Sequence, residues 1–237
     1  MRRFDMKADW DARARANAGS AIVGDKGLND ATFCDSGKRD LELILKGVTP
    51  LLRDRKAVLE IGCGTGRLLE ALNGYFDHLY GVDVSGEMVR RGRERLSGLP
   101  HVHLTEIDGR GKLPFEEGSF DLCFAYITFH HIPEKSVVHR YVREANRVLK
   151  TQGVFRFHLF GRSEGALQAV RERVTRKSTW RGCKLTLSEA VAMTRAAGFD
   201  VVEANYIQAE DRSRFFGKTP PHVIWITAVK PAMEDLS

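Results

Sequence analysis

The chain has 237 residues, of which 43% are hydrophobic and 29% are charged, and its formal net charge is +6. This length and balance predict a single globular domain and argue against an intrinsically disordered protein. No apolar run approaches the ~18 to 20 residues that would cross a bilayer, and the charged amino terminus lacks the apolar core of a signal peptide. We therefore expect a cytoplasmic protein with no membrane partner.

Alternating apolar and amphipathic segments run through most of the chain. Strand-like runs occupy residues 56–61, 78–82, 102–106, 120–126, 153–160, 200–206 and 222–229. Helical patterns follow several of them, over residues 67–72, 87–96, 135–149 and 187–197. Ser85 is the expected N-cap of the second of these helices, and Gly198 is expected to end the last one.

This alternation predicts an α/β fold of the doubly wound type, with a mostly parallel, seven-stranded sheet and helices on both faces. The last two strands lack a helix between them, so we expect an antiparallel pair at one edge. Residues 51–237 would form this core. Residues 1–50 are expected to form an amino-terminal helical lid, and residues 161–185 a substrate-recognition segment.

The cysteines give no sign of a metal site. Cys34, Cys63, Cys123 and Cys183 are far apart and form no C-x-x-C pair, and no histidine lies near them at zinc-ligand spacing. We predict free thiols and no structural metal.

A glycine-rich turn joins the first strand to the first helix, with the sequence Val58-Leu-Glu-Ile-Gly62-Cys-Gly64-Thr-Gly66-Arg67. Such a turn lets a ligand approach the backbone and directs main-chain N–H groups at its polar atoms. The dinucleotide fingerprint G-x-G-x-x-G requires glycine where Arg67 stands, and a P-loop requires a Gly-Lys-Ser/Thr ending that is absent. Asp83 ends the second strand 21 residues after Gly62, where a carboxylate can accept both ribose hydroxyls. The ligand should contain a ribose, and a dinucleotide-dependent oxidoreductase is disfavoured.

Four motifs follow one another in order along the chain: V-L-E-I-G-C-G-T-G at 58–66, G-V-D-V-S at 81–85, D-G-R-G-K-L-P-F at 108–115 and S-F-D-L at 119–122. Together they resemble the class I methyltransferase family, whose cofactor is S-adenosylmethionine. The resemblance covers residues 56 to about 160 well, the two terminal strands more loosely, and the first 50 residues hardly at all. It implies an S-adenosylmethionine-dependent methyltransferase.

By that resemblance, seven residues would contact the cofactor: Glu60, Gly62, Gly64, Gly66, Asp83, Asp108 and Gly109. The three glycines would hold its methionine part, Glu60 would orient their loop, and Asp83 would bind the ribose. The Asp108 carboxylate would accept from the adenine amine, and the Gly109 N–H would donate to a ring nitrogen. Each acidic residue has another interpretation: Glu60 could cap the adjacent helix, and Asp83 could be an N-cap. Asp108 and Gly109 could form an ordinary turn.

The loop after the fourth strand, residues 125–133, is where a methyl acceptor should approach. Methyl transfer from a sulfonium mainly requires alignment of the nucleophile and exclusion of water, and an oxygen acceptor also needs a base. His130 or His131 could deprotonate a hydroxyl, because an imidazole titrates near ~pH 6.5. They could instead brace the loop or line the cofactor pocket. Tyr126 and Phe129 are expected to shape the pocket.

Two aromatic residues of the amino-terminal segment are candidates for a cover over the site. Trp10 stands in an alanine-rich stretch that could form a short helix closing over the cofactor, as lids do in sites that exclude water. A surface helix that packs one aromatic ring onto the core is the alternative. Phe33, ahead of an expected N-cap at Ser36, carries the same two interpretations.

Basic residues at positions 171–184 surround Trp180 and include Arg181, which makes this segment a candidate for substrate binding. The segment could meet the phosphates of a nucleic acid, with Trp180 stacking on a base. It could also bind a carboxylate or phosphate of a small metabolite, and a solvated helix face is a third explanation. Amino-methylating nucleobase enzymes resemble one another in an Asp/Asn/Ser-Pro-Pro-aromatic motif after the fourth strand, where this chain has Ala-Tyr-Ile-Thr-Phe.

We therefore predict methyl transfer to O or N of a small molecule that could be anionic. A nucleic-acid methyltransferase and a non-catalytic S-adenosylmethionine-binding protein stay open as alternatives, because a fold and a cofactor site do not by themselves establish turnover. The oligomeric state is not predicted.

Overall fold

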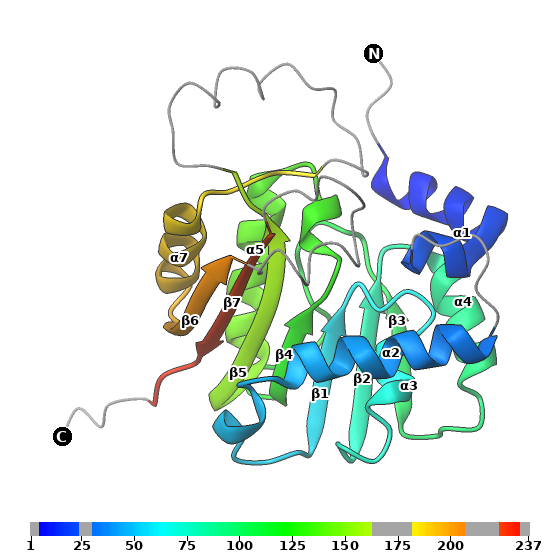
Figure 1. The fold of residues 1–237 in the computed structure, drawn as a ribbon, viewed down its shortest axis with the longest axis horizontal. Coiled ribbons are helices and arrows are strands. Elements are labelled where there is room, and N and C mark those ends of the chain that lie inside the picture. Colours follow the sequence, from blue (N-terminus) through cyan, green and yellow to red (C-terminus); the bar gives the residue numbers. More distant parts are fainter. Residues whose placement is uncertain (1–4, 24–29, 163–181, 207–222, 233–237) are drawn as a thin grey trace.

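The structure, a computed structural model, describes residues 5–23, 30–162, 182–206 and 223–232. A seven-stranded sheet is flanked by helices on both faces (Figure 1). The strands are β1 (Ala57–Ile61), β2 (His78–Asp83), β3 (Val102–Glu106), β4 (Phe120–Ala125), β5 (Leu149–Phe160), β6 (Asp200–Tyr206) and β7 (Val223–Val229). Their order across the sheet is β3-β2-β1-β4-β5-β7-β6.

The first five strands run parallel, and β7 runs antiparallel to both of its neighbours, β5 and β6. This confirms the mostly parallel α/β sheet and the antiparallel pair at one edge. The chain order of the strands reverses between β1 and β4, and in such sheets ligands bind at the carboxyl ends of the strands beside the reversal. All six residues of β4 are buried, so the strand presents its chemistry only where it ends.

The helices are α1 (Met6–Val23), α2 (Asp30–Leu45), α3 (Arg67–Ala71), α4 (Gly86–Arg95), α5 (Lys135–Val148) and α7 (Leu187–Ala196), with 3₁₀ turns η1 (Thr49–Leu51) and η2 (Phe129–His131). Apolar side chains of α2, α3 and α4 form one core with one face of the sheet. Those of α5 and α7 form a second core with the other face. α1 packs Ala14 and Ala18 against Met88 of α4.

Local sequence signals account for most of the element boundaries. Ser85 caps α4 as expected, because its Oγ accepts the N–H of Met88 at 3.1 Å. The expected N-cap at Ser36 is wrong, since α2 begins at Asp30 and Ser36 lies inside it. The Ser36 hydroxyl donates to the Phe33 carbonyl and accepts from the Arg67 guanidinium, which satisfies it within the fold. β5 begins at Leu149, four residues before the start at residue 153 that the sequence predicted.

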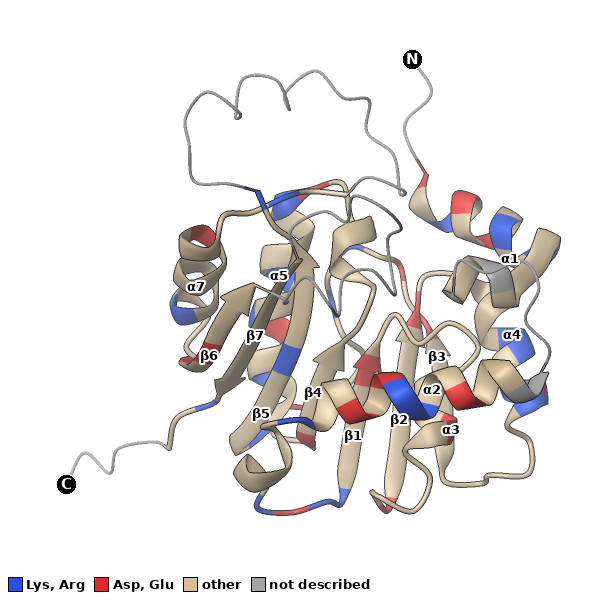
Figure 2. Cartoon of the chain, viewed as in Figure 1, with Lys and Arg blue, Asp and Glu red and all other residues tan. Residues whose placement is uncertain are grey.

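Charged residues lie mainly on the helices, which carry both signs, while the strands carry few and mostly near their ends (Figure 2). Within the part of the chain that the structure describes, no helix is long and apolar enough to cross a membrane. Over those same residues, no three His, Cys, Asp or Glu side chains are grouped as metal ligands would be. The four cysteines are free thiols.

Candidate active site

A cavity lies at the carboxyl ends of β1, β2 and β4, where the sheet topology places a ligand. It holds about 870 Å³ of empty space, its solvent-open part included. Its lining includes the glycine loop with Glu60, the end of β2 with Asp83, the loop after β4 with Tyr126 and His131, and α1 with Trp10. The lining is largely apolar, so its few polar groups determine what it recognises.

The glycine loop needs glycine for its backbone conformation. Gly62, Gly64 and Gly66 have φ angles of 79°, 54° and 77°, in the left-handed region that residues with a Cβ rarely adopt. The N–H groups of Gly62 and Cys63 both donate to the Val82 carbonyl, at 2.7 and 3.0 Å, which folds the loop back over β2. Gly62 and Gly64 line the cavity, whereas Gly66 is the N-cap residue of α3.

Asp83 ties the glycine loop to the turn before α4. One carboxylate oxygen accepts the N–H of Gly64 at 2.8 Å, and the other accepts the N–H of Ser85 at 2.9 Å. Burial raises the pKa of this carboxyl, and the backbone N–H donors act against that rise. The N-cap alternative for Asp83 is wrong, because Ser85 caps α4.

Glu60 is a buried carboxyl that faces the cavity. It is 3% exposed, and its Oε2 has no hydrogen-bond partner among the residues that the structure describes. Burial raises its pKa to about 8, opposed by the positive charge of Arg67 and reinforced by the negative charge of Asp83. Glu60 does not cap the following helix, since α3 begins at Arg67 and its N-cap residue Gly66 has no side-chain cap. An unpaired buried oxygen of this kind is suited to a polar ligand group.

Asp108 and Gly109 line a second cavity beside the first, with about 1250 Å³ of empty space including its solvent-open part. Met6 and Ile132 line both cavities and so lie between them. The Asp108 carboxylate accepts the N–H of Arg110 at 2.8 Å, and Gly109 has a φ of 70°. This geometry is that of a turn, and the carboxylate keeps further acceptor capacity for a ligand.

The two adjacent histidines have different surroundings. His131 lines the first cavity and meets the Trp10 ring edge-on, with ring centroids 5.1 Å apart. His130 is 1% exposed, lies behind that wall and stacks on Phe160 at 4.1 Å. Burial lowers the pKa of His130 well below its ordinary value, and the neighbouring His131 and His158 lower it further. Of the two candidates for a base, His131 is the one placed to touch a ligand.

Tyr126 and Phe129, the two aromatic candidates of the same loop, also differ in their surroundings. Tyr126 lines the cavity, as expected. Phe129 was expected to shape the pocket, but it is fully buried and packs on Tyr141, Phe155 and Phe157 in the core. The first residue of a 3₁₀ turn can face the core while its third faces the cavity, which the residue types alone do not reveal.

Trp180 and Arg181 lie outside the described residues. The structure resumes at Gly182, whose N–H donates to the His130 carbonyl at 2.8 Å, and Cys183 donates to the Ile132 carbonyl at 2.8 Å. The carboxyl end of the 161–185 segment therefore lies against the loop that carries both histidines.

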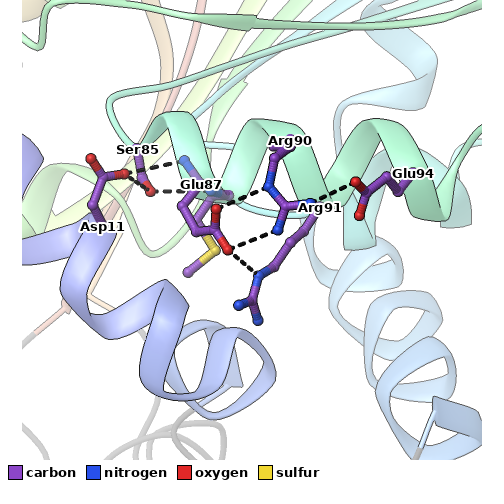
Figure 3. Close-up of polar contacts among 7 residues, drawn as sticks. Asp11, Ser85, Glu87, Arg90, Arg91 and Glu94 are labelled. Carbon is purple, nitrogen blue, oxygen red and sulfur yellow. Dashed lines mark hydrogen bonds and ion pairs between the residues drawn. The ribbon is translucent and has the colours of Figure 1, made fainter.

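α1 forms the outer wall of the cavity and is fastened to α4. The Asp11 carboxylate accepts from the Ser85 hydroxyl at 2.6 Å and from the Glu87 N–H at 3.2 Å (Figure 3). Burial opposes but does not outweigh these hydrogen bonds and the charge of Lys7, so the pKa of Asp11 lies below its ordinary value. The sequence pattern did not single out Asp11, because its partners are 74 and 76 residues away.

Comparisons with known proteins show which proteins the chain is similar to. The profile of the methyltransferase domain family matches residues 59–157. Over 181 residues the chain is 31% identical to a malonyl-[acyl-carrier protein] O-methyltransferase of Geobacter sulfurreducens. The aligned region covers 70% of this chain and 64% of that protein. The chain spans 38–64% of the length of three curated relatives that it matches.

Two solved structures share the fold. One is a protein described as a methyltransferase in complex with the Haloferax volcanii Trm112 methyltransferase activator, with a TM-score of 0.66, 18% identity, and 96% of this chain and 98% of that chain covered. The other is phosphoethanolamine N-methyltransferase 2 of Haemonchus contortus with phosphomonomethylethanolamine and S-adenosylhomocysteine, with a TM-score of 0.64, 22% identity, and 81% and 52% covered. Residues 59–157 of this chain therefore match the methyltransferase domain family, and the chain shares its fold with the two solved proteins.

Proposed function

We propose that the chain transfers the methyl group of S-adenosylmethionine to an oxygen or nitrogen atom of a small, anionic molecule. The observation that carries this proposal is the cavity itself, which has the glycine loop and Asp83 on one side, His131 on another, and α1 across its outer side. A cavity walled in this way suits a small acceptor better than a nucleic-acid chain, whose backbone would need an open, basic groove.

The residues present fit the cofactor of this family. The unpaired oxygen of Glu60 offers an acceptor to a cationic group, and Gly62 and Gly64 line the cavity with backbone that carries no side chain. We assign the ribose to Asp83 and the adenine to Asp108 and Gly109 in the adjoining cavity, while Gly66 shapes the loop. When bound, S-adenosylmethionine supplies a methyl group on an activated sulfonium leaving group.

We assign the acceptor to the region between Tyr126 and His131. His131 would take the proton of a hydroxyl acceptor as it attacks, or the proton of an ammonium acceptor before the freed amine attacks, and the apolar wall with Trp10 would exclude water. Charged acceptors occur among the similar proteins: the Haemonchus enzyme was solved with phosphomonomethylethanolamine, and the Geobacter enzyme is named for a malonyl group on an acyl-carrier protein. The basic segment with Trp180 and Arg181 would attract such an acceptor.

Replacement of Asp83 by Ala should weaken S-adenosylmethionine binding by about 1–3 kcal/mol, or roughly 5- to 150-fold. The change removes the proposed ribose acceptor and leaves the N–H groups of Gly64 and Ser85 without their partner. Titration calorimetry measures the effect. Asp77→Ala is the matched control, because Asp77 is exposed at the opposite end of β2. Equal affinities of the two variants would refute the assignment of Asp83.

We also propose that α1 is a lid that opens to admit ligands. Asp11→Ala removes the carboxylate that holds the amino end of α4, at an expected cost of about 0.5–2 kcal/mol. Amide hydrogen exchange in α1 should then speed up by roughly 2- to 30-fold. Glu94→Ala is the control, since Glu94 pairs only with Arg90 in Figure 3 and is exposed. Exchange in α1 that is the same in both variants would contradict a lid held by Asp11.

The proposed activity is tested by measuring S-adenosylhomocysteine release from S-adenosylmethionine with panels of hydroxy acids, phosphorylated amines and short RNAs. We expect the protein to bind S-adenosylmethionine and S-adenosylhomocysteine but not NAD, and to turn over with a small acceptor. Turnover confined to RNA would replace the proposal by the nucleic-acid alternative. Tight binding without turnover on any panel would favour a non-catalytic binding protein.

A further inference from the structure

A third histidine, His158, lies behind the loop that carries His130 and His131. It belongs to β5, is 3% exposed and pairs in register with Trp225 of β7. Its Nε2 accepts the backbone N–H of Ile127 at 2.7 Å. Only an unprotonated ring nitrogen can accept, so the imidazole is neutral and carries its proton on Nδ1. Its Nδ1 has no partner among the described residues.

The N–H group that donates to His158 belongs to Ile127, whose backbone conformation is unusual. Ile127 has a φ of 54°, and a β-branched residue in the left-handed region costs on the order of 1–3 kcal/mol unless its surroundings hold it there. Ile127 lines the cavity, between Tyr126 and Thr128, which line it too. The strained residue therefore sits in the part of the loop that would meet the acceptor.

His158 contacts this loop through a second residue. The Tyr126 ring meets the His158 ring edge-on, with centroids 4.8 Å apart, and it stacks on Trp225 at 5.9 Å. His158 and Trp225 are themselves in ring contact at 5.0 Å. One side chain thus supports both the direction of the Tyr126 ring and the backbone turn that follows it.

We propose that His158 is a positioning residue of the acceptor site. By accepting the Ile127 N–H it holds the left-handed turn that sets Tyr126 and Ile127 in the cavity wall and leads the chain into η2 and His131. This role rests on the proposed function, because the cavity wall it sets is the one assigned to the acceptor. The cofactor side of the cavity, built by the glycine loop and Asp83, is held by separate hydrogen bonds.

An apolar side chain at position 158 would not replace this role. Phenylalanine would fill the space, but it would leave the Ile127 N–H buried without an acceptor and release the strained turn. Glutamine can present an amide oxygen close to the position of Nε2, so it can accept the same N–H. The pair His158→Phe and His158→Gln therefore separates hydrogen bonding from packing.

Nitrogen NMR of the labelled wild-type protein tests the geometry without any substrate. A through-hydrogen-bond coupling should join the Ile127 amide nitrogen to His158 Nε2, with the chemical shift of an unprotonated ring nitrogen. The groups facing His158 are His130 and His131 of η2, Arg156 of β5 and Tyr126. Burial lowers the pKa of His158 to about 3, so the signal should not titrate between pH 5 and 8. A protonated Nε2 would overturn the proposal.

Binding and kinetics of the variants test the role. His158→Phe should raise the acceptor KM or lower kcat by roughly tenfold or more, a free-energy change of about 1.4 kcal/mol. His158→Gln should recover most of that loss, and S-adenosylhomocysteine affinity should stay within about threefold in both. His139→Phe, on an exposed position of α5, is the matched control. Equal kinetics of His158→Phe and wild type, or no rescue by Gln, would overturn the role.

The outcomes also separate this inference from the proposed function. A wild-type protein that shows the nitrogen coupling but no turnover contradicts the methyltransferase proposal and the acceptor role alike, and leaves only a structural hydrogen bond. Turnover in wild type with an unchanged His158→Phe variant contradicts the positioning role alone. If His158→Phe does not fold, the coupling in wild type and the kinetics of His158→Gln against His158→Asn decide, because the shorter Asn amide cannot reach the Ile127 N–H.

Discussion

Gly62→Ala is expected to reduce S-adenosylmethionine affinity by about 30-fold or more, which corresponds to roughly 2 kcal/mol. Gly62 has a φ of 79°, and a Cβ built on it would overlap both the hydroxyl and the methyl group of Thr128. Left-handed strain costs about 1–2 kcal/mol, and overpacking against a fixed neighbour adds about 1–3 kcal/mol. Because Gly62 and Thr128 lie side by side on two different loops that line the cavity, the overlap must displace the glycine loop or the loop after β4.

Gly74→Ala is the matched control for this change. Gly74 has a φ of 84°, and among the described residues no heavy atom beyond its chain neighbours lies within 4 Å of a Cβ built there, so the variant reports left-handed strain. It should lose stability in denaturant unfolding while binding the cofactor normally. A second variant, Gly62→Ala with Thr128→Ala, should regain part of the affinity, since it removes the two nearest atoms. Gly62→Ala that binds as well as Gly74→Ala would show that Thr128 does not constrain the loop.

The sheet could be predicted from the sequence because its signals are local. Strands read as short apolar or alternating runs between turns, and the expected ranges 102–106 and 200–206 coincide with β3 and β6. The place of β7 between β5 and β6 follows from long-range pairing, which no local pattern encodes. Ser36 shows the same limit of local patterns. It resembles an N-cap in the sequence, but it lies inside α2, where its hydroxyl accepts a hydrogen bond from Arg67, 31 positions away.

The candidate site divides in a similar way. The positions of the glycines and of Asp83 could be predicted, because they follow from backbone conformation and strand ends, which the motif spacing reflects. His130 and His131 could not be separated, because their directions depend on how η2 packs against β5. His158 was missed, although a signal existed: in the run Phe155-Arg-Phe-His158-Leu-Phe, polar residues interrupt a strand that is otherwise buried and apolar.

Glu60→Gln is expected to abolish a pH dependence that Glu60 gives to both folding and cofactor binding. The folded pKa is raised by burial to about 8 from an ordinary 4.5, so the folded state holds a proton that the unfolded state has lost between these values. The contribution to stability is complete below pH 4.5 and is lost as the pH rises toward 8. Denaturant unfolding of wild type should therefore weaken over this range relative to Glu60→Gln.

Cofactor binding should show the opposite trend. S-adenosylmethionine carries cationic groups, which favour the ionised carboxylate and lower its pKa, so binding releases up to one proton and the affinity rises with pH toward 8. Titration calorimetry in buffers of different ionisation enthalpy measures the number of protons released on binding. The cofactor amine and Asp83 are present in wild type and in Glu60→Gln, so the difference in proton release between the two proteins reports the removal of the Glu60 carboxyl. Identical proton release in both would show that Glu60 does not face the cofactor charge, and would return it to a purely structural role beneath the glycine loop.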